Sequence, residues 1–344
     1  MSNNDFNDQD ELAPYDYELP EDAIAQVPLD VRSNARLLDA TGSKIVDRHV
    51  FDLPDMCEPH DVLVVNDTKV FPARIMLFKA TGGKVEILLI ESLESGSWVA
   101  LANPSKGLSS GTVLFDSTQA PAVEIIERLR VDKDSPVKLL VRLVSLNLVQ
   151  SNGVVPLPPY IKTPLANPDR YQTVFANQSS SVAAPTAGLH LDERVLDALR
   201  AKDVKIVKIE LAVGLDTFLP IKSKLITGHK IHTERYHVEP DAWEIIANAK
   251  RVTAVGTTVV RTLETVALTG TLSGRSSLFI HGDYKYKVID RLMTNFHIPR
   301  SSLLLLVEAF VGSRWKEIYA HGLSNGYRFL SFGDAMLLER RSGS

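Results

Sequence analysis

The sequence predicts an α/β protein in which a layered main domain with a mixed sheet is interrupted by an inserted all-β domain, a small barrel. Three observations lead there. Buried-strand patterns alternate with helical patterns near both ends of the chain, residues 74 to 148 show short strand-like runs with almost no helical periodicity, and the Pro-rich stretch NGVVPLPPYIKTP marks a return linker. The expected main domain is residues 14–73 and 154–338, the insertion is 74–153, and the expected disordered tails are 1–13 and 339–344.

A short helix and a buried strand are expected before the insertion. LPEDAIAQVP reads as a short helix bracketed by prolines, and DVLVVND reads as a buried strand that ends in Asn66, Asp67 and Thr68. Within the insertion, alternating apolar residues predict five strands, which are KVEILLIESL, SWVALAN, TVLFD, AVEIIERL and VKLLVRLV.

Helical and strand patterns resume after the linker. Asp192 is placed to cap a helix, and VKIVKIEL alternates as a strand. Asp241 with Glu244 predicts a capping box before AWEIIANAK, after which RVTAV reads as a strand, Gly-Thr-Thr as a turn and VVRTLETVA as a helix. Residues 303–310 are apolar except for Glu308, which predicts a helix buried along its length with a buried entrance at Asn295 and His297.

The composition of the chain limits the classes of protein to which it can belong. The 344 residues are 44% hydrophobic and 23% charged, as in a folded soluble protein. No apolar run approaches the roughly 18 residues of a membrane span, and the acidic, polar N-terminus does not resemble a signal peptide, so we expect a cytoplasmic protein without membrane contact. A single cysteine, Cys57, excludes an intrachain disulfide and an iron–sulfur cluster held by several thiolates of one chain. The net charge of −4 neither supports nor excludes an RNA partner.

Four segments share one pattern, in which an apolar strand stops and a helix or loop opens with small polar residues. They are Asn66-Asp67-Thr68, Thr186 to His190 including Gly188, Gly256-Thr257-Thr258, and Thr294 to His297. Ligands of open α/β sheets bind beyond the carboxyl ends of strands, where helix N-termini present unpaired N–H groups. Each segment alone is consistent with an ordinary helix cap or turn, but four of them in one chain predict one composite site.

Individual side chains in or near these segments can each be interpreted in two ways. His190 and His297 are either catalytic or buried histidines whose nitrogens are satisfied by backbone groups. Arg261 and Glu264, three residues apart on a predicted helix, are either site residues or a surface pair.

The string HKIHTERYHV, which contains His232 and Glu234, has residue types that could bind a metal ion. Neither a helix nor a strand brings all of its histidines to one face, and the spacing matches no named zinc motif, so substrate contact or acid–base work is favoured and no metal is expected. Motifs of P-loop proteins, dinucleotide-binding folds and α/β-hydrolases are also absent from the sequence.

Together these motifs resemble the S-adenosylmethionine:tRNA ribosyltransferase-isomerase family of queuosine biosynthesis. The resemblance extends from about Tyr15 to Leu338 and is carried by YDYELPEDAIAQVP, VVNDTKVFPAR, PLPPYI, RYQTV, AAPTAGLH, VGTTVVRTLE, TNFHIPRSSLLLLV and YRFLSFGDAML. It implies an α/β domain with a β-barrel insertion. It also implies transfer and isomerisation of the ribosyl part of S-adenosylmethionine onto a 7-aminomethyl-7-deazaguanine in tRNA, giving epoxyqueuosine and releasing adenine and methionine.

Under this resemblance S-adenosylmethionine is a substrate, no prosthetic group is expected, the macromolecular partner is tRNA and a monomer is the working expectation. The hypothetical catalytic residues are His190, His297, Glu264 and Arg261. The hypothetical substrate-binding residues are Asn66, Asp67, Thr68, Thr186, Gly188, His232, Glu234, Gly256, Thr257, Thr258 and Asn295. Basic residues in or beside the matching motifs are expected to contact tRNA, namely Arg32, Arg36, Lys69, Arg74 and Arg300.

The chain departs from the family pattern at a few positions. Lys69 stands where Arg is usual, Ala212 where a His is common, and His281-Gly282-Asp283-Tyr284 where Tyr-Pro-Gly-Tyr is expected. Two functions from different classes therefore stay open. One is a working ribosyltransferase-isomerase, and the other is a divergent relative that binds tRNA or an adenosyl ligand without this reaction or with a different acceptor.

Overall fold

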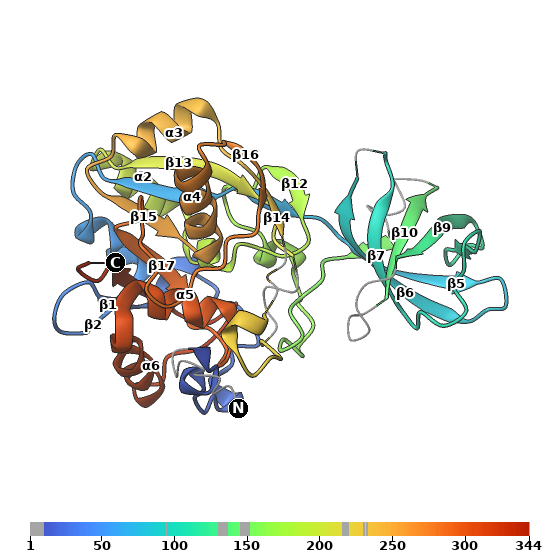
Figure 1. Ribbon diagram of the computed structural model, residues 1–344, viewed down its shortest axis with the longest axis horizontal. Coiled ribbons are helices and arrows are strands. Elements are labelled where there is room, and N and C mark those ends of the chain that lie inside the picture. Colours follow the sequence, from blue (N-terminus) through green and yellow to red (C-terminus); the bar gives the residue numbers. More distant parts are fainter. Residues whose placement is uncertain are drawn as a thin grey trace, which may run out of the picture. The chain divides into compact units, whose positions relative to one another are not determined.

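A computed structural model describes residues 10–93, 95–129, 137–144, 152–214, 220–229, 231 and 233–343. The chain divides into two compact units (Figure 1). The larger comprises the chain up to Lys69, Pro158–Gln178 and the chain from Ala184 onward, and the smaller comprises Val70–Leu157 and Ser179–Ala183.

The larger unit is built on a mixed sheet in which the described residues form nine strands, in the order β16-β14-β13-β3-β15-β17-β18-β1-β2. The four central strands β13, β3, β15 and β17 are mutually parallel, whereas β18 runs antiparallel to β17. The predicted mixed sheet is confirmed. The strands are β1 Arg36–Ala40, β2 Val46–His49, β3 Val62–Asn66, β13 Lys205–Leu211, β14 Glu234–His237, β15 Val252–Val255, β16 Ser273–Ser276, β17 Arg291–Asn295 and β18 Ala335–Glu339.

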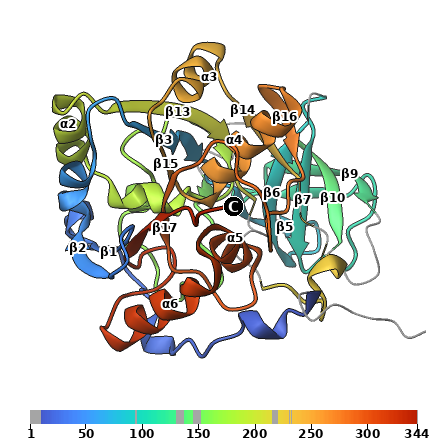
Figure 2. The same cartoon turned by 60° about the vertical axis from the view of Figure 1, so that its left-hand side comes forward.

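Strand β3 lies in the middle of the sheet because its sequence, VLVVN, has no polar residue before its last position. All five residues are buried, as expected of a strand covered on both faces. Leu63 and Val65 belong to a core cluster with Val195, Leu196 and Leu199 of α2. Helix α4 packs against β3, β13, β15 and β17, and Figure 2 shows it beside these strands.

The predicted helices appear in the predicted order, but one lacks its predicted cap and another is only a 3₁₀ turn. The helices are α2 Glu193–Ala201, α3 Pro240–Ala247, α4 Thr257–Thr269, α5 Ser302–Val311 and α6 Trp315–Ser324. The Asp192 carboxylate caps α2 by accepting the Val195 N–H at 3.2 Å, as predicted. The predicted capping box at Asp241 is wrong, because Pro240 already occupies the first turn of α3 and no side chain caps it. LPEDAIAQVP forms only the 3₁₀ turn η3, Glu21–Ala23.

Helix α5 is the buried helix expected from the sequence, since seven of its ten residues are buried. The Ser301 hydroxyl fixes its start by accepting the Leu304 N–H at 3.2 Å. The expected disordered tail does not reach Leu12, which is fully buried against Ile221, Ile226 and Leu305. None of the helices formed by the described residues combines the length and the hydrophobicity of a bilayer span.

The smaller unit contains the predicted barrel. Its strands pair in the order β11-β5-β6-β7-β10-β9-β8, and an additional β5–β8 pairing closes six of the strands described into a ring. Register shifts at Leu89/Glu91, Leu114/Phe115 and Leu140/Val141 bend the strands, as closure requires. The strands are β5 Arg74–Lys79, β6 Lys84–Ser92, β7 Trp98–Asn103, β8 Val113–Phe115, β9 Pro121–Leu129, β10 Lys138–Leu143 and β11 Gly153–Val154. A further two-stranded pairing joins β4 Thr68–Val70 to β12 Gln178–Ser181.

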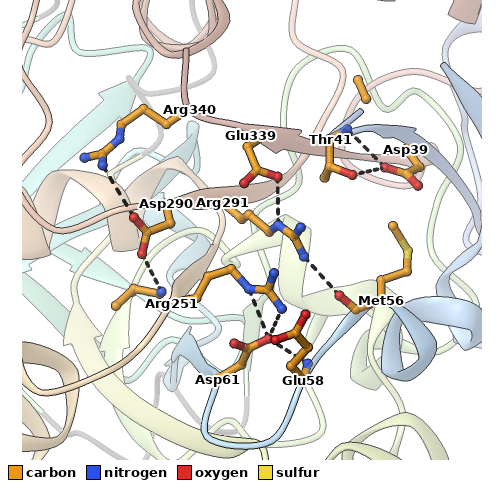
Figure 3. Close-up of polar contacts among 12 residues, drawn as sticks. Asp39, Thr41, Met56, Glu58, Asp61, Arg251, Asp290, Arg291, Glu339 and Arg340 are labelled. Atoms are coloured by element: carbon orange, nitrogen blue, oxygen red, sulfur yellow. Dashed lines mark hydrogen bonds and ion pairs between the residues drawn. The ribbon is translucent and has the colours of Figure 1, made fainter. Parts of the chain in front are cut away.

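An ionic network joins the starting ends of the parallel strands (Figure 3). Arg251, just before β15, donates from Nε to the Asp61 carboxylate at 3.1 Å and makes a second, shorter contact from its terminal nitrogen. Asp61 precedes β3, is almost fully buried and also accepts the Glu58 N–H. Beside them, Arg291 of β17 contacts Glu339 of β18 at 3.0 Å. The network therefore fixes the ends of the strands opposite to their carboxyl ends.

Replacing Arg251 with Ala should lower the free energy of unfolding by about 3–5 kcal/mol, because it leaves the buried Asp61 carboxylate without its partner. Denaturant unfolding measures the loss. The matched control is Lys250→Ala, whose ion pair with Glu58 is exposed, with 66% and 58% of the two side chains accessible, and should cost less than about 1 kcal/mol. Equal losses in the two variants would contradict the prediction.

Candidate functional site

A hollow of about 560 Å³ opens at the carboxyl ends of the central parallel strands. We call it the main hollow. None of the described residues that line it is an Asp, Glu, Lys or Arg; they are Tyr160, Ala184, Pro185, Thr186, Ala187, Val213, Gly256, Thr257, Thr258, Thr294, Asn295, Phe296, His297, Ile298, Leu303, Leu330 and Ser331.

Asn295, the last residue of β17, joins the walls of the main hollow. Its Nδ2 donates to the Leu330 carbonyl at 3.1 Å and to His190 Nε2 at 2.8 Å, and its Oδ1 accepts the Thr186 hydroxyl at 3.1 Å. The carbonyl can only accept, which fixes the orientation of the amide. One side chain thus holds three segments that are far apart in the sequence.

His190 is held in one tautomer by this amide. Because Asn295 donates to Nε2, Nε2 must be unprotonated and the proton of the neutral ring resides on Nδ1. Burial, and then the nearby cations Arg328 and Arg32, lower the pKa of His190 to about 3. His190 lies directly behind Asn295 and does not itself line the main hollow.

His297 lines the main hollow and is positioned through its backbone. Its N–H donates to the Tyr319 hydroxyl at 3.1 Å, and its carbonyl accepts the Tyr17 hydroxyl. The ring Nε2 lies 3.1 Å from the Thr294 hydroxyl. Burial lowers the pKa of His297 to about 3, so this imidazole is uncharged at neutral pH.

The N-terminus of α4 forms another wall. Gly256 adopts φ +94°, a conformation that favours glycine, and a Cβ at this position would lie 3.4 Å from the Ala187 Cβ. The chain can therefore turn sharply from β15 into α4, which brings Thr257 and Thr258 to the main hollow. The buried hydroxyl of Thr258 has no hydrogen-bond partner among the described residues, so it is available to a ligand.

Other predicted site residues lie behind the walls. Arg261 forms a buried ion pair with Glu234 and donates from Nε to the Leu278 carbonyl at 3.2 Å. Glu234 Oε1 accepts the N–H of Gly214, which follows the end of β13. Arg261 and Glu234 thus hold backbone near the site and do not line the main hollow.

Glu264 of α4 is fully buried. Its carboxylate accepts the N–H groups of residues 287–289 at 2.9 to 3.3 Å and the Tyr284 hydroxyl at 3.2 Å. These bonds occupy the carboxylate and fix the loop before β17. Glu264 therefore anchors that loop, and it does not line the main hollow.

The segment after β3 is likewise structural in this geometry. Asn66 bonds the backbone of Leu211 in both directions, at 3.0 and 3.2 Å, and so joins the ends of β3 and β13. Burial raises the pKa of Asp67. Asp67, Thr68 and Gly188 do not line the main hollow, and a Cβ on Gly188 would meet Phe175 at 2.8 Å, so packing alone requires glycine there.

Two further predictions concern metals and basic residues. His232 lies outside the described residues, and no cluster of His, Cys, Asp or Glu within the described ranges is arranged to hold a metal ion. Arg36 stacks over the Tyr327 ring at 3.7 Å, Arg74 pairs with Glu86 at 3.6 Å, and Lys69 is exposed. The buried Nε of Arg300 has no partner in the described part of the chain. Arg32 borders a second hollow behind His190.

The prediction missed the lining residues that come from loops without a strand-end pattern. Tyr160 and Ser331 are joined by a 2.7 Å hydrogen bond between their hydroxyls, and both border the main hollow. PLPPYI and YRFLSFGD contain these residues, and both stretches carried the family resemblance. That resemblance was the signal that could have found them.

Comparison with known proteins decides the family. Residues 12–338 match the family described as Queuosine biosynthesis protein. The chain belongs to this family. The predicted family is therefore confirmed over nearly the whole sequence.

Similar members of the queuosine biosynthesis family share nearly their full length with this chain. The S-adenosylmethionine:tRNA ribosyltransferase-isomerase of Moorella thermoacetica is 44% identical, covering 95% of this chain and 99% of that protein. The protein of the same name from an Azoarcus species is 43% identical, covering 96% and 97%. The crystal structure of S-adenosylmethionine tRNA ribosyltransferase from Thermotoga maritima has a TM-score of 0.54 and 32% identity, and the match covers 94% of this chain and 99% of that one.

The two buried histidines of this family member should make its stability depend on pH. Their folded-state pKa of about 3 lies below the ordinary value of 6.5, so between these values the unfolded chain binds more protons. Their contribution is complete above pH 6.5 and is lost as pH falls toward 3. For His297→Gln, the plot of unfolding free energy against pH below 6.5 should be shallower than for the wild type, by up to about 1.4 kcal/mol per pH unit. Parallel plots would contradict the assignment.

Proposed function

We propose that this chain is an S-adenosylmethionine:tRNA ribosyltransferase-isomerase. It transfers and isomerises the ribosyl part of S-adenosylmethionine onto the 7-aminomethyl-7-deazaguanine of tRNA, forming epoxyqueuosine and releasing adenine and methionine. The observation that carries the proposal is a hollow whose described lining has no charged side chain and includes a neutral imidazole and a threonine-rich helix N-terminus, in a chain that belongs to the queuosine biosynthesis family.

The lack of charged side chains among the described lining residues suits a sulfonium substrate. S-adenosylmethionine carries a permanent positive charge on sulfur, and a charged imidazole beside it would repel it. His297, with a pKa of about 3, remains neutral. Phe296, Ile298 and Leu303 offer apolar surface to the adenine ring.

The polar groups suit the remaining parts of the substrate. The N–H groups at the start of α4 and the unpaired Thr258 hydroxyl can bind the methionine carboxylate or the ribose hydroxyls. The reaction needs a group that accepts the proton from the carbon beside sulfur and a donor that assists adenine departure. His297 is the neutral group in the main hollow that can accept a proton, and Asn295 and the threonines supply the donors.

His190 acts as a positioning residue in this account. Its Nε2 is already engaged by Asn295, so it fixes the amide that faces the substrate. The same bond makes His190 unavailable as a base through Nε2. Arg261, Glu234 and Glu264 support the surrounding backbone, and we assign them no chemical step.

The proposal also covers the compartment, the oligomeric state, the domains and the tRNA contacts of the enzyme. We place it in the cytoplasm as a monomer, with the two compact units as its two domains and tRNA contacted by basic residues of both. The alternative is a family member that binds tRNA or an adenosyl ligand without turnover or with another acceptor. The departures at Lys69, Ala212 and His281 to Asp283 are outside the lining of the main hollow, which favours the catalytic function.

Incubation with S-adenosylmethionine and tRNA that carries the precursor base should release adenine and yield the heavier nucleoside, measured by chromatography and mass spectrometry. His297→Ala and Asn295→Ala should lower kcat by about 100-fold or more, because a proton-transfer group or a preorganised donor is lost.

The matched histidine control is His60→Asn. His60 is exposed, precedes β3 at the opposite edge of the sheet, and has φ +69°, which asparagine tolerates. This variant should retain wild-type activity. Ligand binding without adenine release by the wild type would favour the alternative function, and full activity of His297→Ala would remove that residue from the mechanism.

The variant Glu264→Gln tests whether Glu264 anchors the loop before β17 or acts as a catalytic carboxylate. An amide group cannot accept all the N–H bonds that the carboxylate accepts, so the free energy of unfolding should fall by about 2–3 kcal/mol. Adenine release per folded molecule should stay within a few-fold of wild type. Glu244→Gln, on the exposed side of α3, should change stability by less than about 0.5 kcal/mol. Unchanged stability with abolished adenine release would instead make Glu264 a catalytic residue.

A further inference from the structure

A second hollow of about 280 Å³ is lined by His190, the residue whose Nε2 is bonded to Asn295 of the main hollow. We call it the arginine hollow, because Arg32, Arg170 and Arg328 line it together with His190. Ser331 borders both the arginine hollow and the main hollow. The two are therefore neighbours, and the hydrogen bond between His190 and Asn295 connects their linings.

The guanidinium groups of the arginine hollow are held by backbone carbonyls. Arg32 donates to the Leu189 carbonyl at 3.0 Å and to the Asp169 carbonyl at 3.3 Å. Arg170 donates to the Asp30 carbonyl at 3.1 Å and also to the Leu29 carbonyl. Carbonyls fix the orientation of the two groups without neutralising their charge.

Nearby carboxylates leave a positive excess. Arg328 pairs with Asp334 at 3.7 Å, while the same carboxylate accepts the N–H groups of Arg36 and Arg328. Asp192, the other carboxylate near Arg32, is engaged by Ser33 and Arg194. No acidic residue lines the arginine hollow within the described part of the chain.

Electrostatic effects on neighbouring groups agree with this excess. Burial, and then the charge of Arg170, lower the pKa of Arg32. Arg328 and Arg32 likewise help to lower the pKa of His190. The buried Nε of Arg170 has no hydrogen-bond partner among the described residues. The arginine hollow therefore has guanidinium donors of fixed orientation, one N–H group without a partner among the described residues, and an excess of positive charge.

We propose that the arginine hollow binds a phosphate group of the tRNA backbone. Guanidinium forks match the oxygens of phosphate, and the guanidinium groups of Arg32 and Arg170 are already oriented here by backbone carbonyls. The three arginines are only partly buried, which leaves them accessible to a large partner. The inference rests on the proposed function and adds a fixed point at which tRNA is held beside the reacting centre.

A second source of an oxyanion is the methionine carboxylate of S-adenosylmethionine. That carboxylate is attached to a carbon that also bears an ammonium group, which requires a nearby acceptor. The carbonyls and the Asp334 carboxylate at the arginine hollow already accept hydrogen bonds. The phosphate is therefore favoured, and the experiment separates the two.

Affinity for precursor-bearing tRNA should be measured over a range of salt concentrations, without S-adenosylmethionine, for wild type, Arg170→Gln and Arg170→Lys. Arg170→Gln should weaken binding about tenfold at about 0.1 M salt and reduce the slope of log affinity against log salt by about 1. Arg170→Lys should keep the slope and lose a few-fold in affinity, because charge remains but the fork is lost. The KM for S-adenosylmethionine should be unchanged in both.

Arg200→Gln is the matched control, since it makes the same charge change on exposed α2, where Arg200 pairs with Asp197 at 2.6 Å. It should leave affinity and slope unaltered. If Arg170→Gln does not fold, as judged by thermal melting, Arg170→Lys decides by its affinity alone, and wild-type affinity in that variant overturns the proposal.

The remaining outcomes distinguish failure of the phosphate site from failure of the proposed function. A raised KM for S-adenosylmethionine with unchanged tRNA binding would assign the arginine hollow to the carboxylate and overturn the phosphate. Wild-type affinity and slope in Arg170→Gln, with adenine release intact in the wild-type enzyme, would overturn only this inference. A wild-type chain that neither binds tRNA nor releases adenine would overturn the proposed function as well.

Discussion

The geometry of the site depends on one side-chain amide at the end of one strand. Asn295 is held in orientation by the Leu330 carbonyl, and it then fixes the Thr186 hydroxyl and the tautomer of His190. This is possible because neighbouring strands run parallel and end at one edge of the sheet, where loops from distant parts of the sequence meet. The opposite ends of these strands are fixed by ion pairs such as Arg251–Asp61, so the ion pairs and the main hollow lie at different ends of the same strands.

Burial determines the electrostatic character of the main hollow. Two histidines are placed where water is scarce, so both stay neutral, and the arginines nearest to His190 face the other side. A cationic substrate on one side of His190 and a polyanionic one on the other would each meet a suitable environment. The hydrogen bond between Asn295, which lines the main hollow, and His190, which lines the arginine hollow, connects the two proposed sites.

The sequence predicted the fold class and the convergence of strand ends because both depend on local patterns. VLVVN can only be a buried strand, and Gly256 followed by two threonines is a strong signal for a turn into a helix. It did not predict the place of Glu264, because spacing shows which residues share a helix face but not what that face meets. Barrel closure through β5 and β8 and the contribution of Ser331 are equally long-range, so local periodicity carried no information about them.

The most direct test of the central claim is a crystal structure of the chain with S-adenosylmethionine bound. The account requires the ligand in the main hollow, with its ribose or methionine part within hydrogen-bond distance of Thr258 or Asn295 and its sulfonium near the neutral ring of His297. A ligand bound elsewhere on the molecule, with the main hollow empty, would contradict it.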